Sequence, residues 1–177
     1  MTTQYLFAGF GGQGILFAGK LLAYKGLTEG KNVSWLPSYG PEMRGGTCNC
    51  SVNIEDEPVG SPLVTEPDIL VAFNKPSFEK FCPCVKPGGS VFIDSSLISD
   101  KCTRNDIKAE YIPATALADS GGFVKLANVI MLGYIIKATG FCDLEIIEKA
   151  LKKCISPRKQ HLLPKNMEAV GIGYALD

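Results

Sequence analysis

The 177-residue sequence is poor in histidine and has no excess charge. His161 is the single histidine, and 18 Lys and Arg residues balance 18 Asp and Glu residues. One histidine, in a polar stretch, leaves no evident Cys–His or Ser–His–Asp arrangement for nucleophilic catalysis. Zero net charge removes the broad electrostatic reason to expect nucleic acid as a partner. It is compatible with self-association of the isolated chain into a homo-oligomer.

Long apolar runs are also missing. The longest uncharged apolar segment lies between Lys125 and Lys137 and has 11 residues, whereas a bilayer-spanning helix needs about 20. Residues 1–4 lack the basic region with which a signal peptide begins. We therefore expect no membrane span and a cytoplasmic location.

The seven cysteines are an odd number, so they cannot all pair within one chain. Two C-x-C pairs occur, Cys48 with Cys50 and Cys82 with Cys84. Zinc and iron–sulfur sites usually use C-x₂-C or longer spacings, and free cysteine is among the most often buried residues. We expect reduced, buried or incidental thiols and no metal ligands, with a metal site as the alternative.

The pattern of short apolar runs alternating with helical runs predicts one α/β domain over residues 1–177. We expect a three-layer α/β/α sandwich with a mostly parallel, Rossmann-like sheet plus a β-hairpin. The runs at 69–73 and 90–94 are apolar throughout, as in parallel strands buried on both faces. Further strands are expected at 5–8, 32–36, 47–54, 58–60 and 110–112, and helices at 14–25, 75–81, 123–138, 144–154 and 164–176.

Local signals set the expected boundaries. Pro37 should end the strand 32–36, and residues 47–54 should form the hairpin with 58–60 across an acidic turn. Asn74 and Asp143 are candidate N-caps, and Gly140 is a candidate C-cap.

A glycine-rich turn is the sharpest local feature. Gly9, Gly11 and Gly14 form G-x-G-x-x-G, with Gly12 and Gln13 between them, after a strand and before a helix. Glycine allows a phosphate to approach the backbone, and a helix N-terminus offers free N–H donors. The turn is therefore a candidate ligand-binding site.

Two other interpretations of this turn remain open. Classical NAD(P) binding requires an acidic residue after the second strand to hold the ribose, but that strand ends Ser34-Trp35-Leu36-Pro37. The turn could also be only a tight strand-to-helix crossover. It is not a Walker A loop, because no Lys-Ser or Lys-Thr follows Gly14.

A second polar loop, residues 37–46, follows the second strand. In an open α/β sheet it should reach the carboxyl edge near the glycine turn, where ligands bind. Its candidate binding residues are Ser38, Tyr39, Arg44, Gly45 and Gly46. The Arg44 guanidinium suits a phosphate or carboxylate. The alternative is a surface loop in which Arg44 pairs with Glu42.

These two motifs, in this order, resemble the gamma subunit of 2-oxoacid:ferredoxin (or acceptor) oxidoreductases. The similarity extends over 74–77, 86–89, 127–133 and 166–173, and so covers essentially the whole chain. The form Tyr-Gly-Pro-Glu-Met-Arg-Gly-Gly at 39–46 is most similar to the 2-oxoglutarate branch. Pyruvate, branched-chain and indolepyruvate members are similar.

The resemblance implies a reaction in which a 2-oxoacid is decarboxylated on thiamine diphosphate. Electrons then leave through iron–sulfur clusters to ferredoxin, and the acyl group passes to coenzyme A (CoA). In this family the diphosphate and clusters sit in other subunits, and the gamma component is associated with covering bound CoA. The resemblance implies alpha, beta and, where present, delta subunits as partners, a non-catalytic chain, and no tightly bound cofactor of its own.

Two other hypotheses remain at this stage. A free-standing nucleotide-dependent oxidoreductase would use the glycine turn alone. A simple self-associating structural domain would use neither loop.

Overall fold

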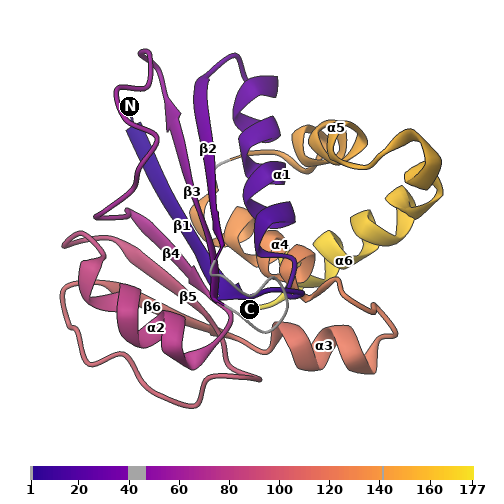
Figure 1. Ribbon diagram of the computed structural model, residues 1–177. Coiled ribbons are helices and arrows are strands. Elements are labelled where there is room, and N and C mark those ends of the chain that lie inside the picture. Colours follow the sequence, from indigo (N-terminus) through magenta and orange to yellow (C-terminus); the bar gives the residue numbers. More distant parts are fainter. Residues whose placement is uncertain (1, 40–46, 141) are drawn as a thin grey trace.

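A computed structural model describes residues 2–39, 47–140 and 142–177. Within these residues the sheet has six strands in the order β2-β3-β1-β4-β5-β6 (Figure 1). The strands are β1 (Thr2–Phe10), β2 (Asn32–Tyr39), β3 (Thr47–Glu55), β4 (Ile69–Ala72), β5 (Ser90–Asp94) and β6 (Lys108–Ile112). The arginine-containing loop, residues 40–46, lies outside the described residues.

Four neighbouring strands, β1, β4, β5 and β6, run parallel. Strand β3 runs antiparallel to both of its neighbours, β1 and β2. The expected mixed α/β fold with a mostly parallel sheet is confirmed. The parallel part brings the carboxyl ends of four strands to one edge, which is where an open α/β sheet places its ligands.

The hairpin expected between 47–54 and 58–60 is wrong. Both edges of β3 are already paired, with β1 and with β2, so no edge remains for a returning strand. The chain after β3 instead crosses the face of this strand. The Asn53 side chain donates to the Ser61 carbonyl (3.1 Å), and the Val64 N–H donates to the Ser51 hydroxyl (3.3 Å).

Pro37 does not end its strand as expected, because β2 continues to Tyr39. Strand β2 is the outermost of the sheet. On an edge strand the missing N–H of a proline can face away from the ladder, so pairing with β3 persists.

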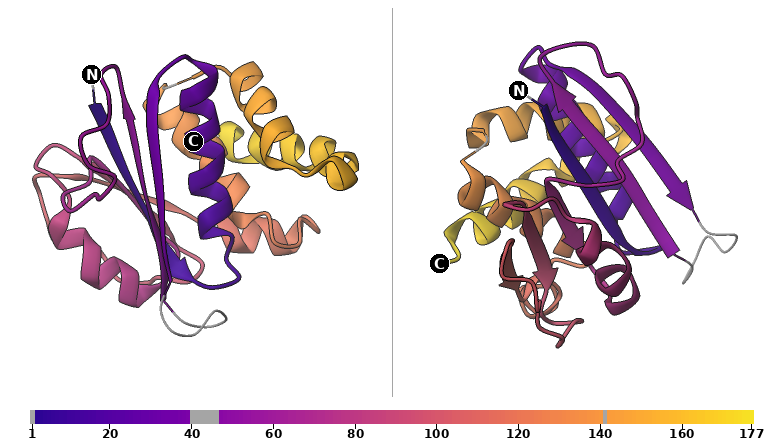
Figure 2. Two further views of the ribbon diagram at one scale, coloured as in Figure 1. Left: turned by 45° about the horizontal axis from the view of Figure 1, so that its top comes forward. Right: turned by 90° about the vertical axis from the view of Figure 1, so that its left-hand side faces the viewer.

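Helices cover the two faces of the sheet unequally (Figures 1 and 2). One face carries α1 (Ile15–Thr28), α3 (Ala114–Ser120), α4 (Ala127–Thr139), α5 (Leu144–Cys154) and α6 (Leu163–Ala175). The other carries α2 (Lys75–Phe81), followed by the 3₁₀ helix η1 (Cys82–Cys84). A second 3₁₀ helix, η2 (Pro157–Leu162), precedes α6. No helix among the described residues has the length and apolarity to cross a membrane.

The alternation of the central strands explains the two cores. In β1, Tyr5 and Phe7 face the larger helical layer, whereas Leu6 and Ala8 face α2. Successive strand side chains point to opposite faces, so an unbroken apolar strand fills both cores.

Caps and glycines set the helix boundaries largely as expected. The Asn74 side chain accepts from the Ser77 N–H (2.8 Å) at the start of α2, and Gly140 ends α4 with φ 60°. Asp143 occupies the N-cap of α5, but its side chain makes no cap hydrogen bond. The helix expected from residue 123 begins only at Ala127, and α3 was not expected.

Helices α4 and α6 cross at two glycines. A methyl group on Gly133 would overlap the Val170 carbonyl, and one on Gly173 would overlap the Ile130 carbonyl. Each glycine therefore faces the backbone of the other helix. Backbone cannot move aside as a side-chain tip can, so this crossing requires both glycines.

We predict that Gly173→Ala lowers the free energy of unfolding by about 1–3 kcal/mol, because the added methyl overpacks the crossing. The matched control is Gly171→Ala on the same helix, where a methyl group meets open space. This control should stabilise by about 0.5–1 kcal/mol through helix propensity. Urea unfolding of both variants measures the difference. Equal stabilities would contradict the close crossing.

Candidate functional site

The carboxyl edge between β1 and β4 is the point where the direction of winding changes. The chain leaves β1 into α1 on one face of the sheet and leaves β4 into α2 on the other. Ligands of open α/β sheets bind in the crevice outside the carboxyl ends at such a point. Here the glycine turn, residues 9–14, lies beside Phe73 and Asn74.

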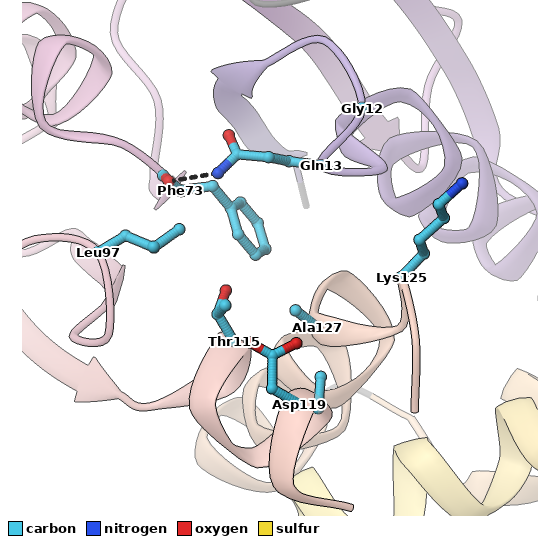
Figure 3. A pocket seen from close by; sticks show the side chains of 9 residues that line it. Gly12, Gln13, Phe73, Leu97, Thr115, Asp119, Lys125 and Ala127 are labelled. Carbon is cyan, nitrogen blue, oxygen red and sulfur yellow. Dashed lines mark hydrogen bonds between the residues drawn. The ribbon is translucent and has the colours of Figure 1, made fainter. Parts of the chain in front are cut away.

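The Gln13 side chain bridges this crevice. Its Oε1 accepts from the Phe10 N–H (2.6 Å), and its Nε2 donates to the Phe73 carbonyl (2.9 Å; Figure 3). A side chain on Gly9 would collide with Gln13 Oε1 and with Phe73, so Gly9 leaves the space that the bridge needs. Gln13 therefore shapes the turn from within.

The end of the turn is fixed to α4. Gly14 has φ 75° and stands at the N-cap of α1, and Gly12 has φ 105°. The buried Asn128 donates from Nδ2 to the Gly14 carbonyl (3.0 Å). A side chain on Gly14 would overlap the Asn128 amide. Left-handed backbone and close packing thus both require glycine at position 14.

A small cavity of about 170 Å³ opens beside Gln13. In Figure 3 Gln13 and Phe73 border it from one side, and Thr115 and Asp119 of α3 border it from the other. Thr115 is already engaged, because its hydroxyl donates to the buried Asp94 carboxylate (2.6 Å). The exposed Asp119 places a carboxylate in the lining of this cavity.

A larger cavity of about 450 Å³ lies on the other side of the turn, against α4 and α6. Its polar lining includes Asn128, which is 3% exposed and whose Oδ1 has no hydrogen-bond partner among the described residues. Asn166 also lines it. Apolar walls are supplied by Phe17, Leu126, Ile155 and Leu162.

Lys125 borders both cavities and has a strained backbone. Its φ is 64°, which is uncommon for a residue other than glycine and costs of order 1–3 kcal/mol. Its side chain is exposed and forms no ion pair with a described residue. In Figure 3 it leads away from the Asp119 carboxylate.

The charges distinguish the two cavities. Lys159 joins Lys125 in the lining of the larger cavity, which has no acidic lining residue among those described. Cys154 is also there, and burial raises the pKa of its thiol to about 12, so it is neutral near pH 7. The larger cavity therefore has a positively charged lining with polar and apolar parts, whereas Asp119 offsets Lys125 in the smaller one.

The predicted site residues fall into three groups. Gly9 lies in β1, one residue before its end, and Gly11, Gly12, Gln13 and Gly14 form the turn between β1 and α1. Ser38 and Tyr39 end β2, and Tyr39 pairs with Cys48, which itself pairs with Gly9. Two strand spacings of about 4.8 Å place Tyr39 roughly 10 Å from Gly9 along the same edge. Arg44, Gly45 and Gly46 lie outside the described residues.

The strand beside β1 differs from that of a dinucleotide-binding fold. There the acidic ribose ligand ends a parallel strand next to β1. Here that neighbour is the antiparallel β3, which begins at this edge with Thr47 and Cys48. The ribose position of the NAD(P) interpretation thus holds a hydroxyl and a thiol, which argues against that interpretation.

Lys125 and Asn128 were missed as site residues by the sequence reasoning. The residue types around Lys125 do not predict a left-handed backbone at this position. Asn128 lies in the stretch 127–133 that resembles the family. Its position shortly after the glycine pair Gly121-Gly122 was the one sequence signal that could have marked it as a candidate site residue.

Cysteines are the residues that would hold an iron–sulfur cluster. All seven cysteines are described, and no three His, Cys, Asp or Glu side chains among the described residues come together as metal ligands. The described part of the chain therefore offers no ligand set for a cluster.

The fold and the crevice together define an α/β domain with a glycine turn and two lysines at its carboxyl edge. The chain belongs to the pyruvate ferredoxin/flavodoxin oxidoreductase family, whose model matches residues 4–176. The family expected from the motifs is thereby confirmed.

Proteins similar to this chain differ in their length and in the substrate that their names state. The 2-oxoglutarate synthase subunit KorC of Methanocaldococcus jannaschii is 36% identical, over 98% of this chain and 93% of that protein. Ketoisovalerate oxidoreductase subunit VorA of Methanothermobacter marburgensis is 45% identical over 78% of this chain. The alignments with two VorA subunits span only 28% and 34% of their lengths.

A solved structure superposes on this chain over almost the full length of both chains. The gamma subunit of a keto/oxoacid ferredoxin oxidoreductase from Geobacter sulfurreducens superposes with a TM-score of 0.81 at 27% identity, over 97% of this chain and 96% of that one.

We predict that Gln13→Glu lowers the free energy of unfolding by about 1–3 kcal/mol. The carboxylate can still accept from the Phe10 N–H, but it faces the Phe73 carbonyl without a proton to donate. Asn105→Asp is the control, because it makes the same amide-to-carboxylate change at an exposed position. Urea unfolding at pH 7 compares the two. A Gln13→Glu variant as stable as the control would disprove the bridge.

Proposed function

We propose that this chain is the gamma subunit of a cytoplasmic 2-oxoglutarate:ferredoxin (or acceptor) oxidoreductase. The complex would convert 2-oxoglutarate, CoA and oxidised acceptor to succinyl-CoA, CO₂ and reduced acceptor. The similarity to KorC over nearly the full length of both proteins supports the substrate. Thiamine diphosphate and iron–sulfur clusters would be held by alpha, beta and, where present, delta subunits.

The observation that carries the role of this chain is the larger cavity at the carboxyl edge. It combines Lys125 and Lys159 with the unpartnered Oδ1 of Asn128. CoA carries phosphates, and its pantetheine arm carries amide N–H and hydroxyl donors. The cations match the phosphates, the Asn128 oxygen matches a donor, and the apolar walls match the methylene stretches.

The proposal assigns a binding role to the residues at this edge. Lys125 and Lys159 bind phosphate, and the Arg44 guanidinium has the chemistry for a bidentate contact with phosphate. The turn at Gly12 allows close approach of the ligand to the backbone. Apolar side chains exclude water from the pantetheine side. The chain binds and covers CoA and contributes no group to the chemical step.

A second candidate substrate is a branched-chain 2-oxoacid. The 45% identity to a ketoisovalerate oxidoreductase subunit favours it. The role of the chain is the same in both cases. Assays of the assembled complex with 2-oxoglutarate, 2-oxoisovalerate and pyruvate decide between them by kcat/KM.

We predict that Lys125→Gly separates binding from folding. Glycine relieves the left-handed backbone, so the free energy of unfolding should stay equal or rise by about 1 kcal/mol. Loss of the cation should raise the KM for CoA about 10-fold or more in the assembled complex. The KM for the 2-oxoacid should not change.

Lys149→Ala is the matched control, because it removes an exposed lysine of α5 that pairs with Glu145. An unchanged KM for CoA in Lys125→Gly would contradict the binding role. Full turnover by alpha and beta partners, co-expressed without this chain, would contradict the proposed function as a whole.

A further inference from the structure

Two cysteines outside the carboxyl edge are in direct contact. Cys82, at the start of η1, places its Sγ 3.7 Å from the Sγ of Cys102. Cys102 lies in the connection between β5 and β6, 20 residues further along the chain. Cys82 is 7% exposed, whereas Cys102 is half-buried and Cys84 is exposed.

The surrounding backbone holds the two thiols together. One guanidinium nitrogen of Arg104, Nη1, donates to the carbonyls of Cys82 (3.1 Å), Pro83 (3.2 Å) and Val85 (2.6 Å). The Cys102 N–H donates to the Tyr111 hydroxyl (2.7 Å). The connection is thereby tied both to η1 and to β6. The hydrogen bonds of Arg104 and of the Cys102 N–H thus hold the two sulfurs in contact independently of each other.

Cys84 has a different environment, although it is only two residues from Cys82. Its Sγ lies 3.8 Å from the Lys80 carbonyl. The geometry therefore selects Cys102, rather than the sequence neighbour, as the partner of Cys82.

We propose that Cys82 and Cys102 form a reversible intramolecular disulfide when the protein meets a peroxide. The sulfur of Cys102, the more accessible of the two cysteines, attacks a peroxide oxygen as the thiolate. This breaks the O–O bond and gives a sulfenic acid and hydroxide, which takes up a proton to form water. The Cys82 sulfur then attacks that sulfur and releases water. In sum, two thiols and one hydrogen peroxide give one disulfide and two waters.

Burial fits this order of events. It raises the pKa of the Cys82 thiol, so Cys82 is unlike a first nucleophile and suits the resolving role. A dithiol such as dithiothreitol reverses the step, because it is oxidised to its own disulfide while two protein thiols re-form.

The disulfide would close a loop that contains β5 and the start of the β5–β6 connection. Leu97, which lines the smaller cavity, belongs to this loop. Closing a loop of this size restricts the unfolded chain. We expect the oxidised protein to melt about 5–10 °C higher than the reduced protein.

The test treats the 177-residue chain with hydrogen peroxide, blocks remaining thiols and digests with trypsin. Cys102 falls in the tryptic peptide 102–104, and Cys82 and Cys84 fall together in 81–101. A disulfide between the two peptides is expected in the wild type and in Cys84→Ser. It should be absent in Cys102→Ser and in Cys82→Ser.

The free thiols of the denatured protein should fall from seven to five, and dithiothreitol should restore seven. The higher melting temperature should appear in Cys84→Ser and not in Cys102→Ser. Seven free thiols after peroxide treatment, a Cys82–Cys84 disulfide, or a cross-link only between chains would each overturn the proposal.

Discussion

The carboxyl edge depends on one side chain, Gln13. Its amide joins the Phe10 N–H of the β1 turn to the Phe73 carbonyl that follows β4. These two strands are the parallel neighbours at which the helices change face. The half-buried amide of Gln13 satisfies both a donor and an acceptor, which a charged or apolar side chain of similar size cannot do. The glycines around Gln13 are therefore partly structural, because they leave room for this bridge.

The same turn is held from the opposite side by Asn128 of α4, which donates to the Gly14 carbonyl across 114 positions of sequence. With β4 on one side and α4 on the other, the turn cannot shift without breaking a partly buried hydrogen bond. It separates two cavities that share Gly12 and Lys125. Rigid placement of this kind is what a site for a flexible, multiply charged ligand requires.

Sequence reasoning predicted the elements that have strong local signals. The apolar strands β4 and β5 and the Asn74 cap follow from periodicity and side-chain chemistry. The pairing of β3 was not predictable in this way, because residues 58–60 had an equally suitable strand pattern and only the sheet order decides between the partners. The site was predicted in its glycine turn but not in Lys125, since backbone strain arises from how α3 and α4 are joined.

The larger cavity is lined by a residue with a strained backbone, Lys125, and by a buried acceptor without a partner among the described residues, Asn128 Oδ1. A crossover alone would be more stable with glycine at position 125, where the lysine backbone is left-handed. It would also be more stable without the unpartnered Asn128 oxygen, since a buried acceptor without a donor costs about 1–3 kcal/mol. Both costs fall on residues that line one cavity, and a ligand that carries an anion and a hydrogen-bond donor would offset both. This coincidence favours the binding interpretation over the purely structural one.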